Sequence, residues 1–181
     1  MKIGLQITKN EKKYDRLLSL IKGDFSQDVD FIHIPDEDSL KSNFKNLDAL
    51  VCYGIKKENF DYRSDKLKWI HIGASGVDGN LFPELIKSKV MITNAKGINA
   101  KPVAEFIMSQ ILYFSKQLHS CEAFKQNRVW NQWELAKNTL QLSDLTLGII
   151  GYGEIGKELS KLAKPFGMKV MATRRLQKKI E

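Results

Sequence analysis

The alternation of apolar and polar residues predicts strands and helices in turn over the first half of the chain. Residues 2–8 alternate like a strand, and apolar residues then recur at helical spacing up to Gly23. Further strands are predicted at 30–34, 49–53, 67–72 and 90–93, with helices at 38–44 and 83–88. Strands that alternate with helices pair in parallel through right-handed crossovers, so the pattern predicts an α/β fold.

The pattern changes after Asn94. A connection at 95–101 leads to a long helix that begins near Pro102, whose missing N–H costs nothing in a first turn. This helix is expected to include His119, and its wide apolar face is typical of a helix that is buried or lies at a subunit contact. Residues 128–137 are expected to be helical or irregular, and a strand is predicted at 146–150.

A glycine-rich turn follows that strand. Residues 151–156 read Gly-Tyr-Gly-Glu-Ile-Gly, between the strand and a helix expected from 154 to about 165, with another strand at 169–173. The string G-x-G-x-x-G is weak evidence by itself, but strand, turn, helix and strand within one short segment are the context of a dinucleotide site.

Each glycine of this turn has a physical reason. Gly151 permits a tight turn, Gly153 lets a pyrophosphate approach the backbone, and Gly156 lets helix and strand pack closely. Amides at the start of the helix then face the phosphates. The predicted cofactor-binding residues of the turn are Gly151, Tyr152, Gly153, Glu154, Ile155 and Gly156.

The end of the following strand bears on the choice of cofactor. An acidic residue there would bind the ribose hydroxyls of NAD, whereas this chain has Thr173, Arg174 and Arg175. Because a guanidinium matches phosphate oxygens, these residues favour NADP(H) over NAD(H). In the other interpretation, the arginines only begin a basic tail.

Composition and charge exclude several classes of protein. The chain has 181 residues, of which 43% are apolar and 28% charged, so it is not of the disordered class. No apolar run reaches the ~18 residues of a membrane span, and the start lacks the pattern of a signal peptide. The two cysteines, Cys52 and Cys121, offer no disulfide framework or thiolate metal site, and no other metal-ligand spacing is visible. We therefore expect a cytoplasmic protein without a membrane span or a metal.

The positive charge is best explained as solvated surface. The 29 Lys and Arg exceed the 21 Asp and Glu by eight, and the dense cluster is Arg174, Arg175, Lys178 and Lys179. Neither aromatic interleaving nor a recognition-helix pattern accompanies it, so nucleic acid is not an expected partner.

Four segments, in order, resemble the D-isomer-specific 2-hydroxyacid dehydrogenase family. They are residues 67–78, residues 92–105, Trp130 and residues 142–175, and they are spread over most of the chain, from residue 67 to residue 175. The end of the last segment is most similar to the NADPH-preferring glyoxylate and hydroxypyruvate reductase branch. The resemblance implies a flavodoxin-like parallel-sheet substrate domain at 1–95 and the first part of a Rossmann dinucleotide-binding domain at 96–181.

The resemblance also implies roles for individual residues. Ser75 and Gly76 would offer backbone N–H groups to a substrate carboxylate, and Tyr53 would line the substrate cleft. Tyr53 is equally well explained as a partly buried strand aromatic. Asp78 is expected to brace its loop rather than to take part in chemistry.

The resemblance implies an enzyme that moves hydride between a nicotinamide and a small 2-keto or 2-hydroxy acid. The family's catalytic Arg, Glu and His would lie beyond Glu181, so none of His33, His71 or His119 is assigned a catalytic role, and a C-terminally truncated, inactive chain is expected. A homodimer through residues 102–147 is expected, and a second chain could supply the missing half. The alternatives are a non-catalytic dinucleotide-binding or assembly module and a decayed gene product.

Overall fold

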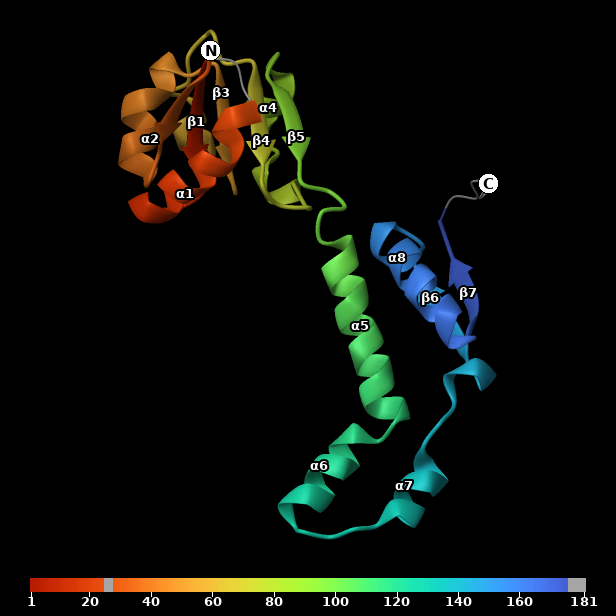
Figure 1. Ribbon diagram of the computed structural model, residues 1–181. Helices are drawn as coiled ribbons and strands as arrows, with labels where there is room; N and C mark the ends of the chain where they lie inside the picture. The colour runs from red at the N-terminus through yellow and green to blue at the C-terminus, as the bar shows by residue number, and fades with distance from the viewer. Residues whose placement is uncertain (25–27, 176–181) are drawn as a thin grey trace. The chain divides into compact units, whose positions relative to one another are not determined.

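The computed structural model describes residues 1–24 and 28–175, and the chain divides into two compact units, 1–96 and 97–181. The first unit holds a five-stranded sheet in the order β2-β1-β3-β4-β5, and every neighbouring pair is parallel (Figure 1). The strands are β1 (Lys2–Gln6), β2 (Asp30–His33), β3 (Ala49–Cys52), β4 (Trp69–Ile72) and β5 (Met91–Asn94). The predicted parallel α/β fold is confirmed, and this strand order is the flavodoxin-like one.

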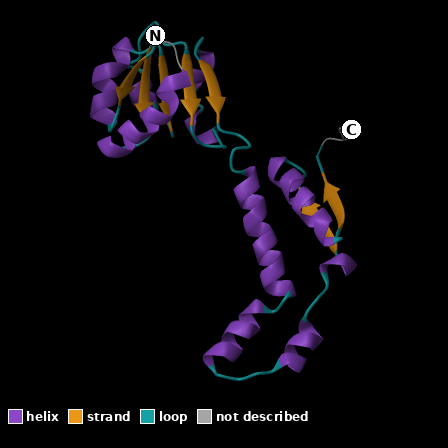
Figure 2. Ribbon diagram, viewed as in Figure 1, coloured by secondary structure: helices purple, strands orange, loops and turns teal. Residues whose placement is uncertain are grey.

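Four α-helices connect these strands and cover both faces of the sheet (Figure 2). Against one face, α1 (Glu11–Ile21) packs Tyr14 onto the strands. The other face forms the larger apolar core, with side chains from α2 (Glu37–Asn43), α3 (Lys57–Phe60) and α4 (Pro83–Lys87). The two longest of these helices begin at side-chain caps: Asn10 accepts a hydrogen bond from the Lys13 amide, and Asp36 accepts one from the Ser39 amide.

The second unit places helices against one face of a two-stranded parallel sheet. Its elements are α5 (Ala100–Ser115), α6 (Leu118–Gln126), α7 (Gln132–Asn138), β6 (Thr146–Ile150), α8 (Glu154–Ala163) and β7 (Lys169–Thr173). Ala104 and Met108 of α5 pack with Leu159 of α8 and Ile149 of β6. After α8 the chain turns at Gly167, whose φ of +77° favours glycine.

The expected single helix through His119 is wrong, because α5 ends at Ser115 and His119 lies on α6. Gln117 takes a left-handed conformation with φ 53°, which a continuous helix does not allow. Its side chain holds the break in place by donating hydrogen bonds to the carbonyls of Phe114 and Asn138. A glutamine whose side chain bonds to backbone carbonyls, one of them far along the chain, is a weak sequence signal, and the break was therefore missed.

One face of the β6–β7 sheet is uncovered within the described residues. Ile150 is 96% exposed and Met171 is 68% exposed, whereas Ile149 on the opposite face is buried. In an all-parallel sheet both faces are normally covered, so these two side chains form an apolar surface that is unusual for such a strand pair.

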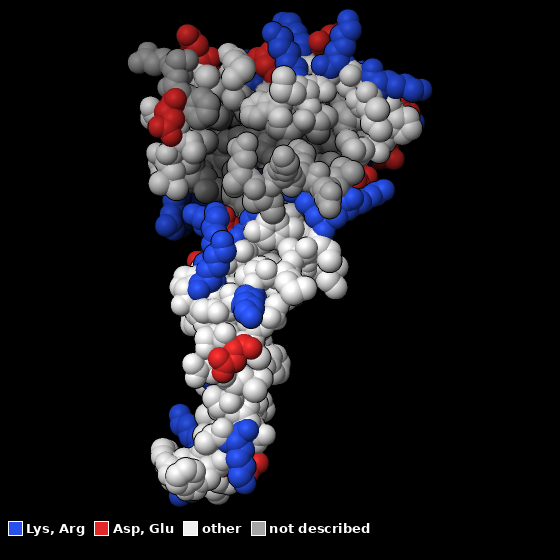
Figure 3. Space-filling view, turned by 90° about the vertical axis from the view of Figure 1, so that its right-hand side faces the viewer, with Lys and Arg blue, Asp and Glu red and all other residues white. Residues whose placement is uncertain are grey.

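Charge is distributed rather than gathered on the surface that can be seen. On the face drawn in Figure 3, Lys and Arg alternate with Asp, Glu and uncharged residues. Lys178 and Lys179, which belong to the basic cluster of the sequence, lie outside the described residues. No helix in residues 1–24 and 28–175 has the length and apolar character that a membrane crossing requires.

Candidate functional site

The glycine turn between β6 and α8 has the geometry of a phosphate cradle. Gly151 has a φ of +92°, a conformation that side-chain-bearing residues rarely adopt. The Gly153 N–H donates to the carbonyl of Gly151 at 3.1 Å, and Gly153 is the N-cap of α8. The first bond of the helix runs from the Lys157 N–H to the Gly153 carbonyl at 3.0 Å, so the amides of Ile155 and Gly156 come before the intrahelical ladder. These amides lie at the positive end of the helix dipole.

The space around Gly153 differs from that around Gly156, as expected where a pyrophosphate approaches one glycine and a strand packs against the other. A Cβ on Gly156 would lie 3.1 Å from the Gly151 carbonyl oxygen and 3.1 Å from Cγ2 of Ile149, so α8 and β6 touch there. A Cβ on Gly153 would meet nothing within 4 Å. The backbone of Gly153 is therefore open to a ligand, while that of Gly156 is closed by packing. The residues present fit a dinucleotide pyrophosphate.

The end of β7 is tied directly to this turn. The carbonyl of Thr173 accepts hydrogen bonds from both the Gly151 and the Tyr152 amides, each at 3.1 Å. Parallel pairing of Ile150 with Thr173 brings the two strand ends side by side. Arg174 and Arg175 follow at once and are exposed, and within the described part of the chain neither forms an ion pair. The structure thus brings together all the residues predicted to bind the cofactor.

The predicted carboxylate loop follows β4 in the first unit. Ser75 and Gly76 are both exposed, and a Cβ on Gly76 would meet nothing within 4 Å. The side-chain amide of Asn94, at the end of β5, donates to the Ser75 carbonyl at 2.7 Å, and the Ser75 hydroxyl donates to the Ala95 carbonyl at 3.5 Å. These bonds hold the loop against the end of β5 and leave its surface open to an anion.

Tyr53 links this loop to the end of β3. Its side chain is 63% exposed, so the interpretation as a partly buried strand aromatic does not describe it. A Cβ on Gly73 would lie 3.1 Å from Cε1 of the Tyr53 ring, so the ring covers the beginning of the loop. At the other end, Oδ1 of Asn80 accepts a hydrogen bond from the Ile55 amide at 2.9 Å. The segments 53–55 and 73–80 are therefore held together at both ends.

The histidines have structural partners. His33 stacks on Tyr14 with 4.2 Å between ring centroids, and its Nε2 is 2.8 Å from the Thr8 carbonyl. His71 Nδ1 is 2.9 Å from the Thr93 hydroxyl. No group of three or more His, Cys, Asp or Glu in residues 1–24 and 28–175 could hold a metal ion.

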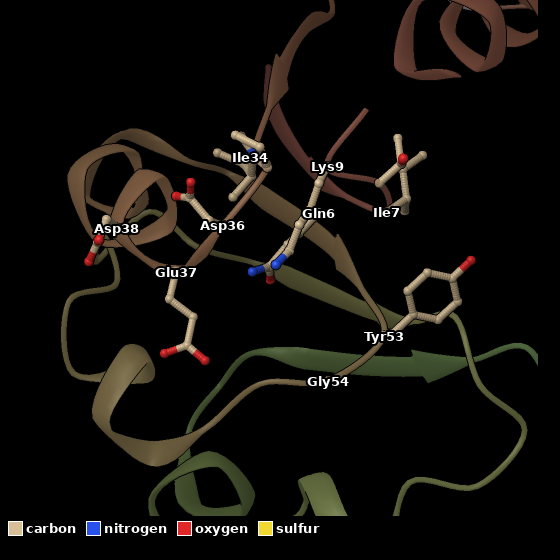
Figure 4. A pocket seen from close by; sticks show the side chains of 11 residues that line it. Gln6, Ile7, Lys9, Ile34, Asp36, Glu37, Asp38, Tyr53 and Gly54 are labelled. Atoms are coloured by element: carbon tan, nitrogen blue, oxygen red, sulfur yellow. The ribbon is translucent and has the colours of Figure 1, made fainter. Parts of the chain in front are cut away.

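Sequence reasoning missed Asn80 and Asn94, and of the residues that line the cleft at the ends of β1 and β3 it named only Tyr53. That cleft holds about 620 Å³ and is lined in part by Gln6, Lys9 and Tyr53 (Figure 4). A signal for it existed, because ligands of open α/β sheets bind at the carboxyl ends of strands where the strand order reverses. The pattern of residues does not contain the strand order, which only the family resemblance implied through its flavodoxin-like sheet. For Asn80 and Asn94, no local pattern marked either residue.

Residues 108–181 match the sequence profile of the D-isomer specific 2-hydroxyacid dehydrogenase NAD binding domain. The chain is 30% identical over 151 residues to the glyoxylate reductase of Thermococcus litoralis, covering 80% of this chain and 46% of that protein. It is also 30% identical over 140 residues to the hydroxypyruvate reductase of Thermotoga maritima, covering 76% and 45% respectively. The chain thus spans about half the length of these curated relatives.

The fold has counterparts among solved structures. The NAD complexed form of a D-isomer specific 2-hydroxyacid dehydrogenase from Lactobacillus delbrueckii ssp. bulgaricus matches with a TM-score of 0.75 at 16% identity. The match covers 98% of this chain and 55% of that one. At this level of identity the likeness establishes the fold alone, and it agrees with the α/β architecture described above.

Proposed function

Because this chain belongs to the D-isomer-specific 2-hydroxyacid dehydrogenase family, we propose that it is the dinucleotide- and substrate-binding part of an NAD(P)-dependent 2-keto acid reductase. The observation that carries the proposal is the contrast within the glycine turn, where Gly153 is open and Gly156 is closed by contact with β6. A glycine turn without a ligand has no need for an open backbone at the start of a helix.

The proposed division of labour follows from the two units. Residues 96–181 hold the cofactor through the six residues of the glycine turn and the end of β7, and residues 1–95 hold the substrate. When bound, the nicotinamide supplies the hydride that reduces a 2-keto acid to a 2-hydroxy acid. Ser75 and Gly76 bind the substrate carboxylate through backbone N–H groups, and Tyr53 forms the neighbouring wall.

NADP(H) is the preferred cofactor in this proposal. Arg174 and Arg175 directly follow β7, whose last carbonyl accepts hydrogen bonds from the glycine turn. Within the described residues no carboxylate forms an ion pair with either arginine. The matching profile is that of an NAD binding domain, and the solved structure from Lactobacillus delbrueckii ssp. bulgaricus is an NAD complex, so the proposed preference for NADP(H) rests on the two arginines alone.

Calorimetric titration of the chain with NADPH and NADH tests the proposal. We expect both to bind and NADPH to bind more tightly. Replacing Arg174 and Arg175 by Ala together should weaken NADPH by about tenfold and leave NADH nearly unchanged, since each charge-assisted hydrogen bond contributes about 1.5–3 kcal/mol before solvent screening. Lys169→Ala, at the other end of β7, is the control for a general loss of positive charge. Failure of both nucleotides to bind would refute the function, whereas equal loss of both in the double variant would refute only the preference.

Two further parts of the proposal concern assembly. The chain forms a homodimer through residues 102–147, where Trp130 is 87% exposed beside an apolar groove between α6 and α7. Because Ile150 and Met171 are exposed on one face of the β6–β7 sheet, we propose that a further polypeptide segment covers this face. The segment belongs to the same polypeptide or to a second chain. Sedimentation should show a dimer for the unmodified chain and a monomer for Trp130→Glu. A monomeric unmodified chain would refute the proposed homodimer.

The described residues bind substrate and cofactor without supplying the proton. The His33 ring lies within hydrogen-bond distance of the Thr8 carbonyl, and the His71 ring lies within hydrogen-bond distance of the Thr93 hydroxyl. Neither histidine lines the cleft beside Tyr53. We expect residues 1–181 to bind NADPH and to show no oxidation of NADPH with glyoxylate, followed by absorbance. Turnover by the purified chain would overturn this part of the proposal. A cytoplasmic location remains a prediction from cysteine usage.

A further inference from the structure

The first residue of α8 is acidic. Glu154 directly follows Gly153, the N-cap of α8, and it is the acidic residue of the first helical turn. A carboxylate at this position stabilises a helix, because it lies at the positive end of the helix dipole. The function proposed above assigns the same end of α8 to the pyrophosphate, which carries two negative charges. The carboxylate and the proposed ligand therefore compete for one positive helix end.

The surroundings of Glu154 keep its carboxylate near the glycine turn. A Cβ on Gly97 would lie 3.8 Å from Cγ of Glu154, so the segment before α5 lies beside the stem of this side chain. In addition, Nζ of Lys157 is 3.0 Å from Oε1 of Glu154. The side chains of Lys157 and Glu154 are 43% and 49% exposed, so water screens the pair and the lysine offsets only part of the negative charge.

A second ion pair of the same kind lies one turn further along α8. Nζ of Lys161 is 2.7 Å from Oε1 of Glu158, and both pairs have the i, i+3 spacing. Such pairs contribute little to the stability of a helix. The two pairs differ in their place, because Glu154 is next to the open backbone of Gly153, whereas Glu158 is a further helical turn away. The second pair therefore provides a comparison for the first within one helix.

From this arrangement we infer that the Glu154 side chain opposes the dinucleotide: its carboxylate lowers the affinity of the glycine turn for the pyrophosphate, and Lys157 offsets part of that effect. The inference rests on the proposed function, because the pyrophosphate is the ligand that the carboxylate repels. Glu154 thus stabilises the start of α8 at the expense of cofactor affinity. Weaker binding shortens the time for which a cofactor stays bound, and so it favours the exchange of oxidised for reduced cofactor.

Removing the charge of Glu154 while keeping its shape tests this inference. Glu154→Gln should tighten NADH, NADPH and ADP-ribose by about threefold to tenfold in calorimetric titrations, because the two charges of the pyrophosphate lie about one helical turn away through water. The gain should shrink as salt is added. Lys157→Ala should weaken all three ligands, since it leaves the carboxylate without its compensating charge. Adenosine, which lacks the pyrophosphate, should bind equally to the unmodified chain and to Glu154→Gln in NMR titrations.

Glu158→Gln and Lys161→Ala are the matched controls, because they change the same charges in the second ion pair. Each should change the affinity for the three ligands by less than about twofold, since the added distance and salt screen the charge. Urea unfolding separates the electrostatic role from a structural one. Glu154→Gln removes a favourable interaction with the helix dipole, so the free energy of unfolding should fall slightly while the affinity rises. Replacement of a residue that only supports the turn would lower both.

Failure of the proposed function and failure of this inference give different results. If NADH, NADPH and ADP-ribose all fail to bind the unmodified chain, the proposed function is wrong and the inference fails with it. If they bind and Glu154→Gln leaves their affinity unchanged or lowers it, only the role of Glu154 is overturned. An equal gain from Glu158→Gln, or a similar gain for adenosine, also overturns it, because the effect would then not depend on a charge beside the pyrophosphate.

Discussion

Replacing Gly153 by Ala separates ligand binding from folding at the glycine turn. Gly153 has φ −92° and ψ −159°, an extended conformation that alanine adopts readily. Its Cβ would meet no atom within 4 Å. The substitution therefore adds a methyl group to the space that we assign to the pyrophosphate and disturbs nothing that is already packed.

The expected effect on stability is small because two contributions oppose each other. Alanine is a poorer N-cap than glycine by several tenths of a kcal/mol, up to about 1 kcal/mol. The same change lowers the entropy of the unfolded chain and stabilises the fold by about 0.4–1 kcal/mol. The free energy of unfolding should thus change by less than about 0.5 kcal/mol.

The expected effect on binding is larger. A methyl group that keeps the pyrophosphate from the amides removes at least one hydrogen bond to a charged group, which is about 1.5–3 kcal/mol. That corresponds to roughly a tenfold to hundredfold weaker affinity for both NADH and NADPH.

Calorimetric titration and urea unfolding of the same preparation measure both quantities. Gly148→Ala is the matched control, because Gly148 lies on β6 of the same unit and its Cβ would also meet nothing within 4 Å. A stable Gly153→Ala protein that binds either nucleotide with unchanged affinity would refute the assignment of this space to the pyrophosphate.

Four other predictions concern stability and reactivity. Gly156→Ala should lower the free energy of unfolding by about 1 kcal/mol, because the cost of overpacking against the turn exceeds the gain in helix propensity. Urea titration measures this change. An increase in the free energy of unfolding would show that β6 shifts easily to make room for the methyl group. Asn80→Ala should cost about 1 kcal/mol by leaving the Ile55 amide unpaired, and Asn80→Asp, which keeps an acceptor, should cost less. Burial raises the pKa of Cys52 to about 11, so Cys121 should react first with a thiol reagent at neutral pH, and equal rates would contradict the buried placement. The folded state favours the neutral Cys52 thiol, so the free energy of unfolding should fall as the pH rises from 9.0 toward about 11. Unfolding experiments at alkaline pH measure this loss of stability.

Much of the fold was predictable because its elements have strong local patterns. The last strand was expected at 169–173 and β7 has the same bounds, since Gly167 and the apolar run that follows it mark the strand clearly. The weak elements were the ones missed. The helix α3 has only four residues, Lys57–Phe60, and the break at Gln117 depends in part on a hydrogen bond to the carbonyl of Asn138, which lies far along the chain.

The candidate site divides in the same way. The six residues of the glycine turn are contiguous, and their spacing alone indicated a strand, a tight turn and a helix that begins at an open amide. The structure then added what spacing cannot contain. The Thr173 carbonyl accepts hydrogen bonds from two amides of the turn. A Cβ would find free space at Gly153, whereas at Gly156 it would press against packed atoms.

The sequence by itself determined the alternation of strands and helices, the glycine turn and the arginines after β7, because each depends on neighbours within a few residues. The pattern of residues does not determine that β1 lies between β2 and β3, an order that only the family resemblance implied. Tertiary structure alone decided which side chains, Gln6, Lys9 and Tyr53 among them, meet in the cleft there. Strand order is chosen by packing of whole faces against helices, and residues far apart in the chain carry no local mark of the neighbours they acquire.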